Sequence, residues 1–236
     1  MYSMKKLLCL LLAAAMLLSC AALAEPEAEE KTLQPGDALH GFTVAEVYDS
    51  SMLNSTIITF NHDVSGATLV YIQNDDPEVA FTIGYHTPYV DETDTNHVFE
   101  HVIISGSDKY PAKDVFFDLN NKAYRTFINA STNYTITYYP VSSLSQDQLI
   151  KMMDVYMSCM VAPAVLTDEN LFKREAVRFE LDDPEGDIAI NGTVFAEDTG
   201  YMTDKADNAM NNLLDALYPG RPPPTRTAWP TRTTMI

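Results

Sequence analysis

The chain contains the pentapeptide His97-Val-Phe-Glu-His101. Its two histidines are four residues apart, and residues at that spacing lie on one face of an α-helix. Both imidazoles can therefore face one metal ion if this stretch is helical. Glu100 directly precedes the second histidine, close enough to reach a water molecule on that ion. The pattern predicts a helix that carries a metal site.

The chemistry of zinc hydrolases needs this combination of residues. Two neutral imidazoles and a carboxylate from elsewhere hold Zn²⁺ and leave its fourth position open for water. Zinc lowers the pKa of that water and polarises the scissile carbonyl, and a carboxylate that is not a ligand accepts the proton. His-x-x-Glu-His is the inverted form of the zinc-protease motif. It predicts His97 and His101 as zinc ligands and Glu100 as the general base.

The alternative is a surface helix that carries two histidines by chance. The chain has only five histidines, and two of them stand at this spacing around a glutamate. Apolar residues lie beside the polar ones, which indicates a half-buried helix. Both observations favour the metal site. Residues 91–96 are rich in Asp and Thr and can cap the start of the helix.

The first 24 residues have the features of a secretory signal peptide. These features are a positive start at Lys5 and Lys6, an apolar run over residues 7–18, and a small-x-small cleavage site at Ala22-Leu-Ala24. A lipoprotein signal with a lipid anchor at Cys20 is the alternative; we prefer cleavage after Ala24. We therefore expect an exported protein, extracellular or in the cell envelope. No later stretch is long and apolar enough to span a bilayer.

The charge of the chain restricts its partners. The formal net charge is −18 at pH 7, and two of the 15 basic residues belong to the signal peptide. A nucleic-acid-binding protein needs a basic face, so we expect no nucleic-acid partner. Residues 25–38 are acidic and contain Pro and Gly, which predicts a flexible lead-in.

The pattern of the remaining chain predicts an α+β fold. Runs of β-branched and aromatic residues separated by turn sequences predict an antiparallel meander, with strands at residues 42–48, 55–60, 67–72 and 79–83. Helices are predicted at residues 97–106, 111–123, 146–160, 168–180 and 194–217, and a further strand pair at 126–132 and 134–139. Strands followed by helices indicate an antiparallel sheet with helices packed on one face.

Several motifs accompany the pentapeptide in a characteristic order. They are Leu39-His-Gly-Phe-Thr-Val44 before it, then Ser105–Pro111, Lys113–Phe117, Thr126–Ala130 and Tyr139–Val141, and finally Gly192–Gly200. In order and separation they resemble the presequence-protease branch of the pitrilysin/insulinase zinc metallopeptidases. The resemblance covers about residues 37–218.

The resemblance implies roles that spacing alone could not assign. Glu197, on the last predicted helix, would be the third zinc ligand. Asn129 and Ala130 stand where the edge strand of the family pairs with the substrate backbone. An extended peptide added to a sheet edge is held mainly by main-chain hydrogen bonds. The implied substrates are therefore unfolded peptides rather than particular sequences.

The chain departs from the pattern of the family at three places. Thr95-Asn96 replaces a glycine-containing approach to the first histidine, Arg174–Arg178 stands where a Gly-Trp pair is common, and Ala196 replaces the usual Asn before the third ligand. None of these changes removes a ligand.

A larger departure is length. Members of this branch have four related α+β domains in two halves that close on the peptide, and the second half supplies an Arg/Tyr pair. We expect residues 39–218 to be a truncated N-terminal peptidase domain, incomplete at its C-terminus. Water exclusion and substrate clamping contribute much of such catalysis, so we expect weak or no activity from this chain alone. A second half-domain or a homologous chain would be its partner.

The composition changes after Gly220. Residues 219–236 are rich in Pro, Arg and Thr and contain the only Trp, which predicts a frameshifted and disordered tail; a natural Pro-rich tail is the alternative. The predicted function is that of a zinc-dependent endopeptidase domain in which Glu100 activates a zinc-bound water. The alternative is a non-catalytic module of the same fold that binds peptides or a partner.

Overall fold

The computed structural model describes residues 32–90 and 93–219. The chain divides into two units, Met1–Asp75 and Asp76–Ile236, and each is described by itself. Three predicted features lie outside the described residues. They are the signal peptide with the alternative lipid anchor at Cys20, residues 25–31 of the lead-in, and residues 220–236 of the tail.

The first unit is an antiparallel meander. Its strands are β1 (Ala38–Leu39), β2 (Phe42–Ser50), β3 (Ser55–His62) and β4 (Thr68–Gln73), and they pair in that order. Val44, Ile58 and Phe60 form its buried apolar cluster. The three longer strands confirm the strands predicted at residues 42–48, 55–60 and 67–72, because β-branched and aromatic residues favour strands.

The second unit contains the sheet that positions the candidate site. Its strands are β5 (Val79–His86), β6 (Phe127–Ile128), β7 (Ser131–Thr132) and β8 (Ile136–Ser143). β8 is central, with β5 antiparallel on one side and β6 and β7 antiparallel on the other. The prediction that residues 79–83 continue the meander is wrong. The alternating pattern identifies a strand but carries no information about its partner, which is β8.

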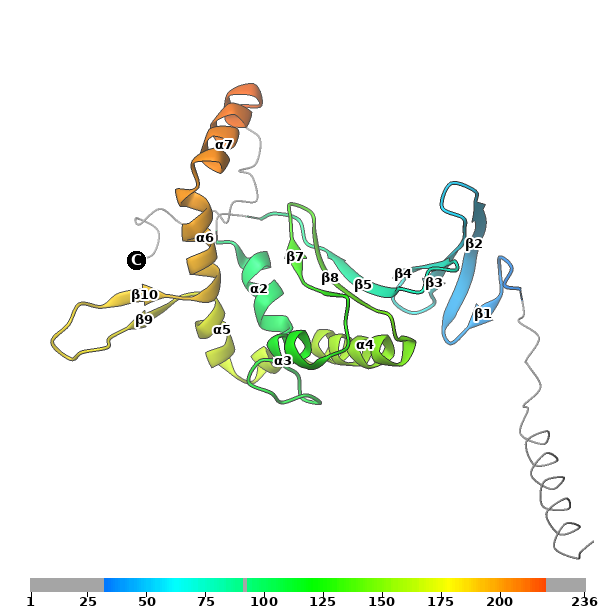
Figure 1. Cartoon of the computed structure of the whole chain (residues 1–236), viewed down its shortest axis with the longest axis horizontal. Coiled ribbons are helices and arrows are strands. Elements are labelled where there is room, and N and C mark those ends of the chain that lie inside the picture. Colours follow the sequence, from blue (N-terminus) through cyan, green and yellow to red (C-terminus); the bar gives the residue numbers. More distant parts are fainter. Residues whose placement is uncertain (1–31, 91–92, 220–236) are drawn as a thin grey trace, which may run out of the picture. The chain divides into compact units, whose positions relative to one another are not determined.

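The same unit contains helices, some of which pack against this sheet. They are α2 (Thr95–Ile103), α3 (Val115–Lys122), α4 (Gln146–Val161), α5 (Glu169–Glu175), α6 (Thr193–Thr203) and α7 (Lys205–Leu217), with a 3₁₀ turn at Ala164–Leu166. Tyr139 and Val141 of β8 pack against Met152 and Tyr156 of α4 and against Ile104 at the end of α2. α2 lies beside β7 and β8 (Figure 1). The predicted α+β class, an antiparallel sheet with helices, is confirmed.

Two helix boundaries differ from the prediction because aspartates start helices. α3 begins at Val115 rather than at residue 111, since the carboxylate of Asp114 accepts a hydrogen bond of 3.0 Å from the amide of Phe117. The segment predicted as one helix over 194–217 is two helices, α6 and α7. They are separated at Asp204, whose carboxylate accepts a hydrogen bond of 2.7 Å from the amide of Ala206.

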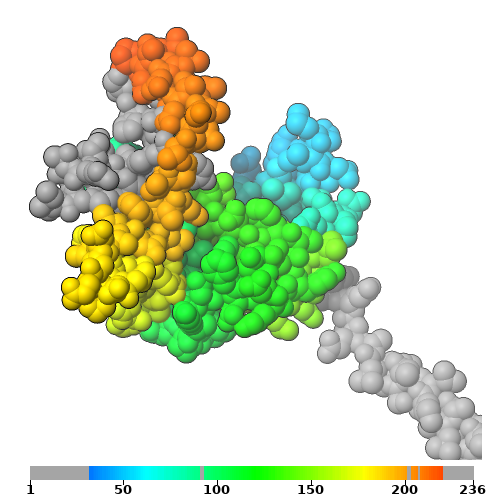
Figure 2. All heavy atoms as spheres, turned by 60° about the vertical axis from the view of Figure 1, so that its left-hand side comes forward, coloured from blue at the N-terminus to red at the C-terminus, as the bar shows by residue number. Residues whose placement is uncertain are grey.

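The helix predicted over residues 168–180 ends early. Asp168 caps it as predicted, by accepting a hydrogen bond of 3.0 Å from the amide of Asn170, but α5 stops at Glu175. An antiparallel hairpin of β9 (Arg178–Glu180) and β10 (Ala189–Asn191) follows. Figure 2 shows this hairpin in yellow beside α6 in orange.

At Gly192, which follows β10, the backbone passes very close to the backbone of Ala176, at the end of α5. A Cβ atom at Gly192 would lie 2.1 Å from the carbonyl oxygen of Ala176, far inside van der Waals contact. Only glycine therefore permits this approach of the two backbones. The contact sets where α6 begins relative to α5, and α6 carries Glu197.

We predict that Gly192→Ala destabilises the protein, because the added methyl group forces these backbones apart. The free energy of unfolding should fall by roughly 1–3 kcal/mol, measured by urea denaturation of the full chain. Gly200→Ala is the control, since a Cβ there would meet no atom of the described residues within 4 Å. Gly200 lies within α6, so alanine should stabilise by roughly 0.5–1 kcal/mol. Equal effects of the two variants would contradict the prediction.

Candidate metal centre

Helix α2 is held in place by an apolar cluster on one of its faces. Val98 and Val102 of α2 are buried against Ala176, which follows α5, and Val194 of α6. The histidines of the pentapeptide lie on another face of α2, and both line a pocket of about 700 Å³. The same packing that buries the valines therefore brings α6 close to the two imidazoles.

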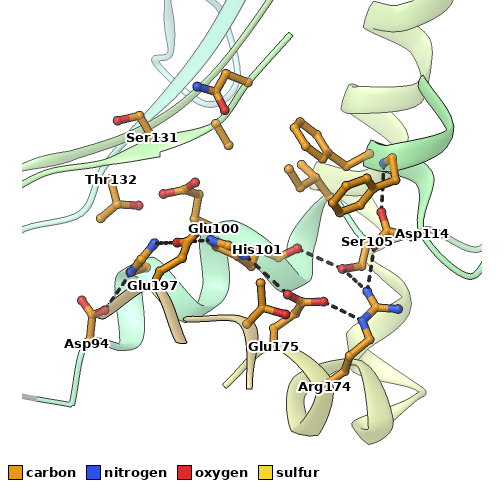
Figure 3. A pocket seen from close by; sticks show the side chains of 17 residues that line it. Asp94, Glu100, His101, Ser105, Asp114, Ser131, Thr132, Arg174, Glu175 and Glu197 are labelled. Carbon is orange, nitrogen blue, oxygen red and sulfur yellow. Dashed lines mark hydrogen bonds and ion pairs between the residues drawn. The ribbon is translucent and has the colours of Figure 1, made fainter. Parts of the chain in front are cut away.

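The predicted ligand atoms converge within this pocket. Nε2 of His97 and Nε2 of His101 each lie 3.5 Å from Oε2 of Glu197 (Figure 3). One ligand atom from each of the three residues falls within 4.8 Å of the other two. Zinc–ligand distances of about 2.0–2.1 Å in a tetrahedron separate neighbouring ligand atoms by about 3.4 Å. The donor set therefore fits a zinc ion in both chemistry and spacing.

Carboxylates surround the two imidazoles. Burial alone would lower the pKa of His97, but hydrogen bonds with Asp94 and Glu197 raise it to about 10. Burial would also lower the pKa of His101, whereas Glu175 and Glu197 raise it to about 9. The same contacts with His101 and His97 lower the pKa of Glu197 to about 2. The pocket therefore has an electrostatic preference for positive charge.

Glu100 lies at the wall of the pocket, and its side chain is buried. Burial raises the pKa of this carboxyl group, and a hydrogen bond with Thr132 together with the nearby histidines offsets part of the rise. Thr132 belongs to β7, so the sheet edge and α2 meet at this carboxylate. A raised pKa makes the carboxylate a better proton acceptor near neutral pH.

Sequence reasoning missed Glu175, which is buried beside His101. Its Oε2 lies 3.4 Å from Nδ1 of His101, and its Oε1 accepts a hydrogen bond of 2.6 Å from Nε of Arg174. Burial would raise the pKa of Glu175, but these bonds and one with Thr193 lower it to about 2. Arg174 also donates to Ser105 Oγ and to the carbonyl of Lys113. Residues 174–178 depart from the pattern of the family, but nothing in their sequence indicates a contact with His101.

The predicted substrate-binding residues, Asn129 and Ala130, lie between β6 and β7 at the edge of the sheet and line the pocket. The amide of Asn129 donates to the carbonyl of Pro140 at 3.1 Å, and the hydroxyl of Tyr156 donates to the carbonyl of Asn129 at 3.3 Å. Both backbone groups of Asn129 are therefore engaged within the fold. Because antiparallel pairing alternates, the backbone groups of Ala130 and Thr132 face away from β8.

Comparison with known families identifies the chain. The description of the matching family is "Insulinase (Peptidase family M16)", and the match covers residues 83–216. The chain belongs to the insulinase family of peptidases. This finding confirms the resemblance drawn from the motifs, and it establishes a peptidase domain of family M16.

The relatives of this M16 domain include several presequence proteases. The mitochondrial presequence protease of Xenopus tropicalis is 32% identical over 188 residues, which are 78% of this chain and 18% of that protein. Presequence protease 1, chloroplastic/mitochondrial, of Arabidopsis thaliana is 34% identical over 170 residues, 72% of this chain and 16% of that protein. The chain thus spans less than a fifth of the length of these relatives.

Among solved structures, the chain is similar to the periplasmic protease PqqL from Escherichia coli. The identity is 14% and the TM-score 0.42, over 79% of this chain and 18% of that chain.

The predicted location is wrong. An exported, extracellular or cell-envelope protein was expected, but the matching relatives are named mitochondrial or chloroplastic presequence proteases. Among the described residues, no helix has the length and apolar character needed to cross a bilayer.

We predict that Glu175→Ala lowers the free energy of unfolding of the metal-free protein by roughly 3 kcal/mol, because it leaves Arg174 without its closest carboxylate partner in a half-buried position. The measurement is urea denaturation. Glu169→Ala on the same helix is the matched control. Its ion pair with Lys173 is exposed, so its loss should cost less than about 1 kcal/mol. Similar costs for the two variants would show that the Glu175 contacts contribute no special stability.

Proposed function

We propose that this M16 domain is a zinc-dependent endopeptidase domain for unfolded peptides. His97, His101 and Glu197 would hold the zinc ion, and Glu100 would be the general base. The observation that carries the proposal is the meeting of both Nε2 atoms with one carboxylate oxygen at 3.5 Å. Zinc in that position would lower the pKa of a bound water and polarise the scissile carbonyl.

Other residues of the chain would bind the peptide and transfer the proton. The outward backbone groups of Ala130 and Thr132 would add the peptide as an extended strand to the edge of the sheet. This pairing would place a peptide bond beside Glu100, which the hydroxyl of Thr132 also contacts. Glu100 would then accept a proton from the attacking water and deliver it to the leaving amine. The side chain of Asn129 lines the same pocket and would contact the peptide.

We propose that turnover by this chain alone is weak. The side chain of Glu197 is 47% exposed, so solvent reaches the third ligand. Exclusion of water strengthens the electrostatic interactions on which such catalysis depends. A second half-domain or a homologous chain would cover this side. The same exposure supports an alternative proposal, a module that binds peptides or a partner without turnover.

We predict that the full chain binds about one zinc ion, and that His101→Ala and Glu197→Ala abolish stoichiometric binding. The measurement is elemental analysis after dialysis against zinc and then against zinc-free buffer. His86→Ala, at the end of β5, is the control and should bind zinc as the parent does. A parent protein that folds but retains no zinc would refute the proposed function.

We predict that Glu100→Gln keeps the zinc but reduces the rate of peptide cleavage by roughly 100-fold or more, because glutamine cannot accept the proton. The measurement is hydrolysis of a quenched fluorescent peptide of unstructured sequence by the zinc-loaded chain. Cleavage that persists in Glu100→Gln would exclude Glu100 as the base. A parent that binds the peptide and zinc without cleavage would favour the binding module.

A further inference from the structure

Asp94 stands at the start of α2 in an unusual backbone conformation. It is the residue before the first helical position, with φ 52° and ψ 30°, in the left-handed region. Residues other than glycine adopt this region at an energetic cost, which is smallest for Asn and Asp. An aspartate in this place normally accepts a hydrogen bond from the helix backbone. Within the described chain the side chain of Asp94 makes no such cap bond.

The carboxylate of Asp94 faces the first histidine instead. Its Oδ2 lies 2.9 Å from Nδ1 of His97, and both side chains are about 15% exposed. An ionised carboxylate can only accept a hydrogen bond, so Nδ1 carries the proton. In neutral imidazole the other nitrogen, Nε2, then has its lone pair free. That atom is the one that lies 3.5 Å from Glu197.

A second carboxylate approaches the same nitrogen from another helix. Oδ1 of Asp198, on α6, lies 3.9 Å from Nδ1 of His97, and the side chain of Asp198 is fully buried. It adds negative charge on the side of the ring that faces away from Glu197. His101 has a comparable arrangement, since its Nδ1 faces Glu175. The Nδ1 atom of each imidazole thus faces a carboxylate, that of Asp94 for His97 and that of Glu175 for His101.

The start of α2 does not depend on the side chain of Asp94 for its anchorage, because the backbone carbonyl of Asp94 accepts from the amides of His97 and Val98 whatever its side chain. The side-chain amide of Asn96 donates hydrogen bonds to the carbonyl groups of Thr87 and Pro88, at 3.1 and 3.2 Å. The contacts of the Asp94 carboxylate are therefore separable from those that hold the helix end.

We propose that Asp94 is a positioning residue for His97. Its carboxylate fixes the tautomer with the proton on Nδ1 and the orientation of the ring, so that Nε2 faces the metal site. The inference rests on the proposed function, because it assigns the contact to zinc binding. It accounts for an aspartate that adopts a left-handed conformation without capping its helix. Partners of this kind behind histidine ligands change metal affinity by roughly 10- to 100-fold.

The test compares Asp94→Gly and Asp94→Asn in the full chain. Glycine removes the carboxylate but suits the left-handed backbone, so the metal-free protein should still fold, with a thermal midpoint lowered only by the loss of the hydrogen bond with His97. Zinc affinity, measured by competition with a chromophoric chelator, should fall roughly 10- to 100-fold. Asparagine keeps an oxygen that can accept from Nδ1, so it should restore most of the affinity. The Nδ1 proton of His97 should be visible by NMR in the zinc-loaded parent and lost in Asp94→Gly.

Asn54→Gly is the matched control. Asn54 also has a left-handed backbone, with φ 48°, but it lies in the first unit between β2 and β3. Its replacement should leave zinc affinity unchanged. Equal affinity of Asp94→Gly and the parent would overturn the positioning role while the proposed function stands. An equal loss of affinity in Asp94→Asn would show that an acceptor for Nδ1 does not set the zinc affinity, and failure of metal-free Asp94→Gly to fold would show a structural role; either result would overturn it. A parent that binds no zinc would overturn both.

Discussion

The candidate site depends on the apolar contact between α2 and the two segments that follow α5. Val98 and Val102 are buried against Ala176 and Val194, with no polar group among these four side chains. The close approach at Gly192 fixes the same junction from the backbone side. A shift of α6 along this contact would carry its carboxylate away from both imidazoles, so the geometry of the candidate metal centre is a consequence of core packing.

Carboxylates on both sides of the two imidazoles determine the electrostatics of this junction. Each imidazole has one nitrogen turned towards Glu197 and the other towards a carboxylate behind it, Asp94 for His97 and Glu175 for His101. Such an arrangement repels anions and is neutralised best by a cation between the two rings. Arg174 balances Glu175 on its far side, which explains how a carboxylate can be buried there. A cation held between the two rings would therefore stabilise the folded protein.

The sequence predicted the parts of this site that are local. His97, Glu100 and His101 share one helix, so their spacing was enough to bring them together. Glu197 was found only through the resemblance to a family, because its distance along the chain carries no geometric signal. Glu175 and the contact of Asp94 were missed, since both depend on which segments pack together. The same limit explains β5, whose pattern predicted a strand while its partner β8 is distant in the sequence.

We propose that side chains from two helices, α2 and α6, bind a single zinc ion. X-ray absorption at the zinc edge of the loaded full chain tests it most directly. We predict a four-coordinate spectrum with two imidazole nitrogens at about 2.0–2.1 Å and oxygen ligands in the remaining positions. A spectrum with one imidazole or none, or one dominated by sulfur at about 2.3 Å, would contradict the account.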